Sequence, residues 1–285
     1  MPSKPPRKWA RKLIAWVVVL VGTYLFACYW LSKAYVSPPR VVSLTPPGAK
    51  VERISEETPA WTVQPKGKVL GVATIVHGYG GTRASMLPLS SIFTQAGYMV
   101  VIPAMPGQDE SKRPQVGFSV DEAKVIEDCV HWVAKRHPGL PQVLFGYSMG
   151  GAAVWSAAPG LPEVKGVISE GAFGRFGPTV DDFFGRKFGA ISFLSFPIRV
   201  ITQQMSGKDP SKINPIEQAK AWRGRKGLVI HGAEDVVVRP AQGEALAEAT
   251  GTELWMIPNC AHVRGLEVAP AEYEKRIRQF LSEIH

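Results

Sequence analysis

The chain has 285 residues, of which 45% are hydrophobic, enough to bury one large core or two small ones. Seven basic and no acidic residues fall in residues 1–40, so the rest of the chain keeps a net charge of only +2 out of +9. This argues against a nucleic-acid partner. The three cysteines, Cys28, Cys129 and Cys260, form neither a disulfide framework nor a C-x-x-C metal motif.

The N-terminal region predicts a membrane anchor. Residues 13–31 are uncharged and almost wholly apolar, and as a helix they would extend about 28 Å, close to the ~30 Å hydrocarbon core of a bilayer. Five basic residues precede them within residues 1–12, which places that end in the cytoplasm. We expect a basic cytoplasmic segment (1–12), a single span (13–32), and an extracytoplasmic domain, on the periplasmic side of the inner membrane if the cell is bacterial.

Three other interpretations of this region remain open. A cleaved secretory signal usually has a shorter apolar core and a cleavage site that is missing here. Leu25-Phe26-Ala27-Cys28 resembles a bacterial lipobox, which would make Cys28 a lipidated N-terminus. The third interpretation is a buried core helix of a soluble domain, which would keep a polar face that residues 13–31 lack. Residues 33–58 are predicted to be a linker, stiffened by prolines in residues 37–50, that holds the domain away from the bilayer.

Residues 59–285 show alternating strand and helix patterns. A capping-box sequence, Ser119-Val120-Asp121-Glu122, predicts the start of one helix, and two more are expected at 241–250 and 271–283. Continuous apolar strands between helices indicate a mostly parallel sheet covered on both faces, with ligands bound where the strands end. The apolar runs are Val69–Val76, Tyr98–Ile102, Gln142–Phe145, Val164–Ile168, Leu228–Ile230 and Leu254–Ile257.

Ser148 is the candidate nucleophile. It follows an apolar strand in Gly146-Tyr147-Ser148-Met149-Gly150, a G-x-S-x-G match. A serine on so tight a strand-to-helix turn needs small residues two positions before and after it, and Gly146 and Gly150 meet that need. The helix that follows points its N-terminus at the site, where a developing oxyanion is stabilised.

A second turn supplies the other candidate donor to an oxyanion. His77-Gly78-Tyr79-Gly80-Gly81 follows the first apolar strand, and its backbone N–H groups can point into a cavity. We predict an oxyanion hole formed by the N–H groups of Tyr79 and Met149. His77 is expected to order the turn rather than to take part in the chemistry.

Candidate partners for Ser148 follow the last two strands. Asp235 and its neighbour Glu234 lie in the segment His231-Gly232-Ala233-Glu234-Asp235, and either could orient a base. The base candidate is His262, the only histidine between Asp235 and the terminal His285. The chain order Ser148, Asp235, His262 is that of an α/β-hydrolase triad.

Taken together, the GYSMGG, HGYGG, HGAED and NCAH segments resemble the α/β-hydrolase superfamily, in particular its lysophospholipase- or aminopeptidase-like serine hydrolases, over about residues 60–285. The resemblance implies the α/β-hydrolase fold, and it favours Asp235 over Glu234, because the family's acid commonly follows H-G-x-x-D. One departure is the loop Pro103–Ser111, where many relatives carry an Asp-x-Arg-Gly-type turn. We expect this loop mainly to shape the pocket.

A cap over the site is expected at about residues 173–222, where no sheet pattern is present. Phenylalanines crowd its first half, which indicates an apolar acyl pocket, rings that pack the cap onto the sheet, or apolar surface that touches the bilayer. The prediction is a serine hydrolase that cleaves carboxylic esters of an apolar or lipid-like acyl group, without metal or organic cofactor. A peptidase, a thioesterase and a non-catalytic membrane-tethered binding protein remain alternatives.

Overall fold

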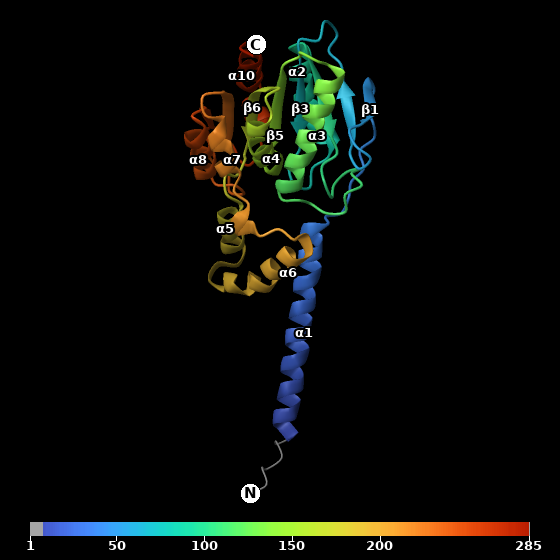
Figure 1. Ribbon diagram of the computed structural model, residues 1–285. Coiled ribbons are helices and arrows are strands. Elements are labelled where there is room, and N and C mark those ends of the chain that lie inside the picture. Colours follow the sequence, from blue (N-terminus) through green and yellow to red (C-terminus); the bar gives the residue numbers. More distant parts are fainter. Residues whose placement is uncertain (1–7, 285) are drawn as a thin grey trace.

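The protein is built around an eight-stranded sheet, seen in a computed structural model that describes residues 8–284 (Figure 1). Residues 1–7 of the predicted cytoplasmic segment, and His285, lie outside the described residues. The strand order is β1-β2-β4-β3-β5-β6-β7-β8. Strands β3 to β8 run parallel, whereas β2 runs antiparallel to both β1 and β4. The bounds are β1 Ala49–Arg53, β2 Pro59–Val63, β3 Gly71–Val76, β4 Tyr98–Pro103, β5 Gln142–Tyr147, β6 Val164–Glu170, β7 Lys226–Gly232 and β8 Glu253–Ile257.

Helices cover both faces of this sheet, as the continuous apolar strands predict. On one face lie α3 (Val120–Arg136), α4 (Met149–Ala157), α7 (Pro215–Ala219) and α8 (Pro240–Thr250). On the other lie α2 (Leu87–Gln95) and α10 (Pro270–Ser282). The short α9 (Gly265–Val268) precedes α10. The fold is the α/β-hydrolase fold, which confirms the prediction.

The two antiparallel strands at the sheet edge were not predicted. Strand β1 falls within the segment expected to be a linker, and its side chains are half-exposed or exposed. Its sequence therefore carries no apolar run. Strand β2 begins at Pro59 and is only five residues long, so its three buried residues, Ala60, Trp61 and Thr62, make a pattern too short to predict a strand. Edge strands of this kind depend on the neighbouring strand more than on their own pattern.

A long N-terminal helix, α1 (Lys8–Val36), extends beyond the domain (Figure 1). It is long and apolar enough to cross a membrane, and it is almost entirely exposed along its apolar stretch. Its C-terminal end packs against the cap, where Ser32 Oγ donates to the carbonyl oxygen of Ile198 at 3.0 Å. Cys28, Phe184 and Ile198 form a buried cluster at this contact.

The segment after α1, which was expected to be a spacer, is attached to the domain surface. It lies along the domain: the N–H of Val116 donates to the carbonyl oxygen of Val36 at 2.9 Å, and Arg40 donates to the carbonyl oxygens of Ser111 and Arg113. A proline-rich chain is already stiff, so little further entropy is lost when its polar groups find partners on the domain surface.

The cap lies between β6 and β7. It contains α5 (Phe176–Phe188), the 3-10 helix η3 (Gly189–Ser195), α6 (Phe196–Ser206) and η4 (Pro210–Lys212). The last part of the segment expected to be cap, α7 and the 3-10 helix η5 (Lys220–Trp222), belongs to the main core instead, because Ile216, Ala219 and Trp222 are buried there.

Candidate active site

Ser148 lies at the turn between β5 and α4, in a backbone conformation that is rare for a residue with a side chain. Its φ is 51° and its ψ is −116°, and such strain persists only where the surroundings enforce it. The neighbouring glycines make the turn possible, because a Cβ on Gly146 would collide with the backbone of Gly150. The serine N–H donates to the carbonyl oxygen of Glu170 at 2.8 Å, which ties the turn to β6.

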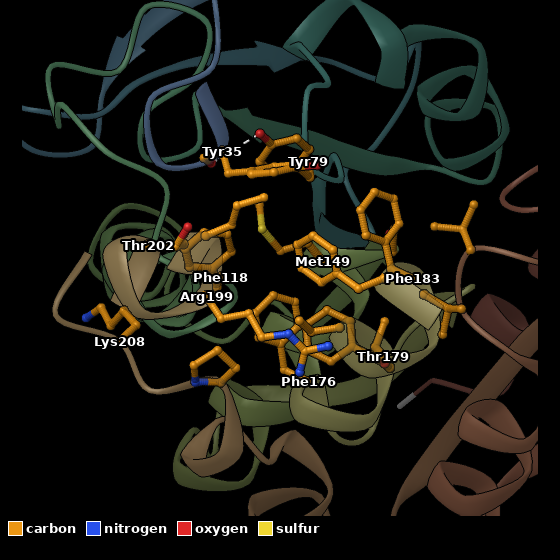
Figure 2. Close-up of a pocket in the computed structure, with 18 residues that line it drawn as sticks. Tyr35, Tyr79, Phe118, Met149, Phe176, Thr179, Phe183, Arg199, Thr202 and Lys208 are labelled. Atoms are coloured by element: carbon orange, nitrogen blue, oxygen red, sulfur yellow. Dashed lines mark hydrogen bonds between the residues drawn. The ribbon is translucent and has the colours of Figure 1, made fainter. Parts of the chain in front are cut away.

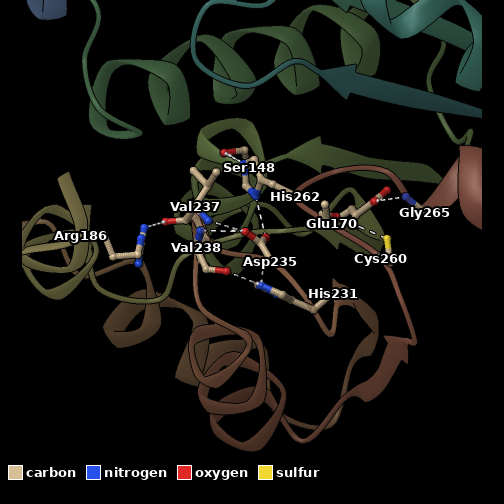
Figure 3. Close-up of polar contacts among 11 residues, drawn as sticks. Ser148, Glu170, Arg186, His231, Asp235, Val237, Val238, Cys260, His262 and Gly265 are labelled. Atoms are coloured by element: carbon tan, nitrogen blue, oxygen red, sulfur yellow. Dashed lines mark hydrogen bonds and ion pairs between the residues drawn. The ribbon is translucent and has the colours of Figure 1, made fainter. Parts of the chain in front are cut away.

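The three side chains singled out from the sequence lie within hydrogen-bonding distance of one another (Figure 3). His262 Nε2 is 2.9 Å from Ser148 Oγ, and His262 Nδ1 is 2.6 Å from Asp235 Oδ2. They come from the ends of β5, β7 and β8, which the parallel sheet brings to one edge.

Asp235 is buried and held as an anion. Its Oδ1 accepts the N–H groups of Val237 at 2.8 Å and Val238 at 2.9 Å. Burial alone would raise the pKa of Asp235, but hydrogen bonds from His231 and His262 outweigh it and hold that pKa well below its usual range. The rival carboxylate, Glu234, is exposed to solvent.

His231 was not predicted to take part in the site. Its ring is fully buried, with Nε2 2.9 Å from the carbonyl oxygen of Val238 and 3.3 Å from Asp235 Oδ2. It therefore supports the carboxylate from the side opposite His262. The only sequence signal was its place at the end of β7, four residues before the acid.

Glu170, at the end of β6, fixes the loop that carries His262 and was also not predicted. Its Oε1 accepts the N–H of Gly265 at 2.7 Å, and its Oε2 accepts the hydroxyl of Tyr273 at 2.6 Å. Burial raises the pKa of Glu170, while these two donors lower it in part. The following Gly171 leaves room for the imidazole, since a Cβ there would lie 3.1 Å from His262 Cε1.

The two residues predicted to supply the oxyanion donors both lie close to Ser148. Met149 is the first residue of α4, so its N–H has no partner within the helix. Tyr79 belongs to the turn after β3, where Gly78 closely approaches the serine: a Cβ on Gly78 would lie 3.0 Å from Ser148 Cβ. The Tyr79 hydroxyl donates to the carbonyl oxygens of Ala34 at 3.2 Å and Tyr35 at 3.1 Å, at the end of α1.

In the same turn, His77 is buried and its Nδ1 lies 2.8 Å from the carbonyl oxygen of Gly78.

The loop Pro103–Ser111 supports this turn and does not shape the pocket, contrary to expectation. None of its residues lines either cavity beside Ser148. Instead, Gln108 Oε1 accepts the N–H of Gly80, and Asp109 Oδ2 accepts both the N–H and the Nε–H of Arg83 at 2.9 Å. Arg83 and Asp109 are fully buried, and a charged pair that is buried needs such paired hydrogen bonds.

Two cavities meet at Ser148. The one under the cap measures about 250 Å³, and its wall is almost entirely apolar (Figure 2). Aromatic rings from the cap form much of this wall, joined by Met149 and by Tyr35 from the end of α1. The second cavity measures about 370 Å³ and is lined by residues of the Tyr79 turn, His262 and α9. Among the described residues 8–284, no group of three or more His, Cys, Asp and Glu side chains is placed to hold a metal ion.

Comparison with known proteins identifies the family. Residues 67–221, more than half of the chain, match the family described as serine aminopeptidase, S33. A thermostable monoacylglycerol lipase of Bacillus sp. (strain H-257) is 30% identical over 97 residues, which cover 33% of this chain and 37% of the lipase. The chain thus matches about a third of that relative's length.

Solved structures support the same fold. An esterase of Pyrococcus furiosus superposes with a TM-score of 0.74 at 21% identity, covering 88% of this chain and 98% of the esterase. A thermophilic esterase of Thermogutta terrifontis with butyrate bound gives 0.62 at 16%, covering 83% and 94%. The chain therefore belongs to the serine aminopeptidase S33 family and is a serine hydrolase of the α/β-hydrolase superfamily.

Proposed function

We propose that the protein is a carboxylic ester hydrolase acting on an apolar, lipid-like acyl group through Ser148, His262 and Asp235. The observation that carries the proposal is the hydrogen-bonded chain from Ser148 Oγ to His262 Nε2 (2.9 Å) and from His262 Nδ1 to Asp235 Oδ2 (2.6 Å), placed where an apolar cavity opens onto the serine.

In the proposed reaction, His262 Nε2 takes the hydroxyl proton of Ser148 as Oγ bonds to the carbonyl carbon of the ester. The carbonyl oxygen becomes an anion, which the N–H groups of Tyr79 and Met149 stabilise. The bond to the alcohol oxygen then breaks, and His262 gives the proton to that oxygen. Asp235 holds the imidazole in the required tautomer and stabilises its charged form.

Water completes the cycle. It attacks the acyl carbon, passes a proton to His262, and the bond to Ser148 Oγ breaks as that proton returns to the serine. The apolar cavity under the cap suits the acyl chain. The second cavity, with backbone groups of the Tyr79 turn, suits the alcohol part of the ester.

Peptidase and thioesterase activity on the same three residues are the nearest alternatives. The mostly apolar wall of the cavity favours the ester, since its two charged side chains, Arg199 and Lys208, are already paired with Asp181 and Asp121 and are not free to hold a peptide terminus. The name of the partly matching lipase agrees with this choice. A non-catalytic tethered protein would have no use for the strained serine or for the buried Asp235.

The experiment that tests the proposal compares wild-type protein with Ser148→Ala. We expect a fluorophosphonate probe to label the wild type only, and p-nitrophenyl esters to be hydrolysed with a preference for medium or long acyl chains. Labelling that persists in Ser148→Ala would remove the serine from the mechanism. A preference for peptide amides would replace the esterase with a peptidase.

We also propose that α1 anchors the protein in a membrane with the hydrolase domain outside the cytoplasm. The length, hydropathy and exposure of α1, and the basic residues before it, support this. The mass of the mature N-terminus checks it: an intact N-terminus is expected, whereas a chain that begins at a lipidated Cys28 would establish a lipoprotein.

A further inference from the structure

The tip of the cap, residues 191–196, exposes a group of large apolar side chains. Phe193 is 69% exposed and Phe196 67% exposed, and Ile191 and Leu194 are also exposed. They belong to η3 and the first residue of α6. Scattered apolar residues are normal on a protein surface, but several large ones on one short segment mark a surface with a partner.

The position of the cap tip along α1 indicates which partner. The Tyr24 hydroxyl donates to the carbonyl oxygen of Leu194, and one α6 turn later Ser32 Oγ donates to that of Ile198. Figure 1 shows α6 beside the upper part of α1. Tyr24 lies about 16 Å along the helix from Leu13, the first apolar residue after the basic segment, and a bilayer core is about 30 Å thick. A membrane that surrounds the apolar part of α1 therefore also reaches the cap tip.

Two cations near this contact lie on the domain side of the cap tip. Lys33 follows Tyr24 by nine residues on α1 and lies 4.8 Å from the centre of the Trp30 ring near the end of the apolar stretch, and Arg199 follows Ile198, whose carbonyl oxygen accepts the Ser32 hydroxyl. Arg199 is paired with Asp181. This order along α1, apolar tip first and cations above it, is the order of a leaflet interior and its headgroups.

The apolar cavity reaches the contact between the cap and α1, where Tyr24 binds the cap tip at Leu194. Tyr35, Phe183, Phe184 and Ile198 line the cavity and also belong to the cluster that packs the cap on α1 around Cys28. A continuous apolar path therefore leads from the contact between the cap and α1 to the wall beside Ser148.

We propose that the cap tip inserts into the outer leaflet of the membrane that holds α1, so that the cavity receives a lipid ester directly from the bilayer. The inference rests on the proposed ester hydrolysis and anchoring, and it specifies the source of the substrate. The occupant of the exposed surface is lipid.

The first test uses the full-length protein in phosphatidylcholine nanodiscs, with an environment-sensitive fluorophore on Phe193→Cys. The matched control is Val51→Cys, on edge strand β1, where Val51 is 59% exposed; the native cysteines are all buried. We expect brominated lipid to quench the label at 193 and aqueous iodide to quench the label at 51. Quenching of both labels by iodide alone would overturn the proposal. It would also be overturned if, in particles that hold two copies of the chain, the label at 193 were protected from iodide but not quenched by brominated lipid.

The second test separates membrane insertion from catalysis. The double variant Phe193→Ser/Phe196→Ser alters neither the triad nor the cavity wall. We expect hydrolysis of a long-chain monoacylglycerol in vesicles to fall roughly tenfold or more, since the two Ser side chains cannot replace the apolar area that the Phe rings bury in lipid. Hydrolysis of soluble p-nitrophenyl butyrate should stay within about twofold, as should both activities of Val51→Ser.

The outcomes are distinguishable. Equal vesicle activity in the double variant and the wild type would refute uptake from the bilayer. A wild type that hydrolyses neither ester would refute the proposed function, while the fluorescence measurement would still decide whether the tip is inserted.

Discussion

Gly150 controls how closely the two turns of the site approach each other. A Cβ at this position would lie 2.5 Å from the carbonyl oxygen of His77 and 2.9 Å from that of Val76. Both oxygens belong to backbone, which cannot move aside as a flexible side chain can. The absence of one methyl group thus allows the Tyr79 turn to lie against the start of α4, where the two proposed oxyanion donors meet.

Gly150→Ala should therefore impair catalysis as well as stability. We expect the turn to be displaced and kcat/KM for a soluble ester to fall about 100-fold or more, the usual effect of losing one oxyanion donor. Ester kinetics and Tm measure the two effects. Gly160→Ala is the control, because a Cβ there meets no atom within 4 Å. A Gly150→Ala enzyme as active as Gly160→Ala would contradict this account of the turn.

Residue-level patterns predicted the positions of Ser148, Asp235 and His262 but not of the residues that hold them. The serine lies in a local motif, and the choice of Asp235 over Glu234 came from a family resemblance. Glu170 and His231 act through tertiary hydrogen bonds to residues far away in the chain or across a turn. No local pattern distinguishes such residues from ordinary strand ends.

At the scale of elements, the start of α3 connects a helix cap to the cavity wall. The buried Glu122 carboxyl group accepts the N–H groups of Gly117 at 2.9 Å and Ser119 at 2.8 Å. Between them, Phe118 has a φ of 51° and lines the cavity. The capping-box sequence predicted that a helix begins here, which is confirmed, but not that its glutamate fixes a strained loop of the site.

This arrangement predicts a pH dependence of stability. Burial raises the pKa of Glu122 to about 7 from 4.5, although its backbone donors lower it in part. The unfolded chain then loses its proton at lower pH than the folded protein, so the free energy of unfolding should decrease as pH rises from 4.5 to 7. The full contribution is about 3 kcal/mol.

Glu122→Gln should remove most of this decrease. Unfolding by denaturant at pH 5 and pH 8 measures it, with Glu127→Gln at a half-exposed position of the same helix as the control. Relative to the wild type, the free energy of unfolding of Glu122→Gln should be higher at pH 8 than at pH 5. An unchanged difference at the two pH values would show that Glu122 does not retain its proton in the fold.

The ease of predicting an element followed its burial. Strands β3 to β8 are mostly apolar because helices cover them on both faces, so their sequences reveal them. Strand β1 and the cap helices carry mixed sequences whose structure depends on their neighbours. The end of the cap was misplaced for the same reason: Ile216 and Trp222 are apolar, and apolarity alone does not say which core they join.

At the scale of the whole molecule, the N-terminal helix is part of the active site's surroundings. The hydroxyl of Tyr79 joins the last turn of α1 to the turn beside Ser148. Burial raises the pKa of Tyr79 to about 12, so the hydroxyl keeps its proton and donates at any physiological pH. Contacts between segments so far apart in sequence leave no periodic signal, which is why only a stiff linker over residues 33–58 was expected.

Tyr79→Phe tests this connection. The two carbonyl oxygens lose the single hydroxyl proton that they share, worth about 1 kcal/mol, and we expect kcat for a soluble ester to fall several-fold with little change in KM. Tyr24→Phe is the control, since it removes another hydroxyl bond between α1 and the domain but lies far from Ser148. Equal kcat values for the two variants would show that α1 does not position the turn.

The attachment of the chain just after α1 determines how the enzyme can move. The Arg40 guanidinium bridges the carbonyl oxygens of Ser111 and Arg113, and the N–H of Ser43 donates to Asp109 at 3.3 Å. The hydrolase domain is therefore attached rigidly to α1 and does not move on a flexible tether. If α1 lies in a bilayer, the hydrolase domain would meet every ester at one fixed tilt relative to the membrane as it diffuses laterally. The rate of turnover would then depend on the mole fraction of the ester among the lipids and not on its bulk concentration.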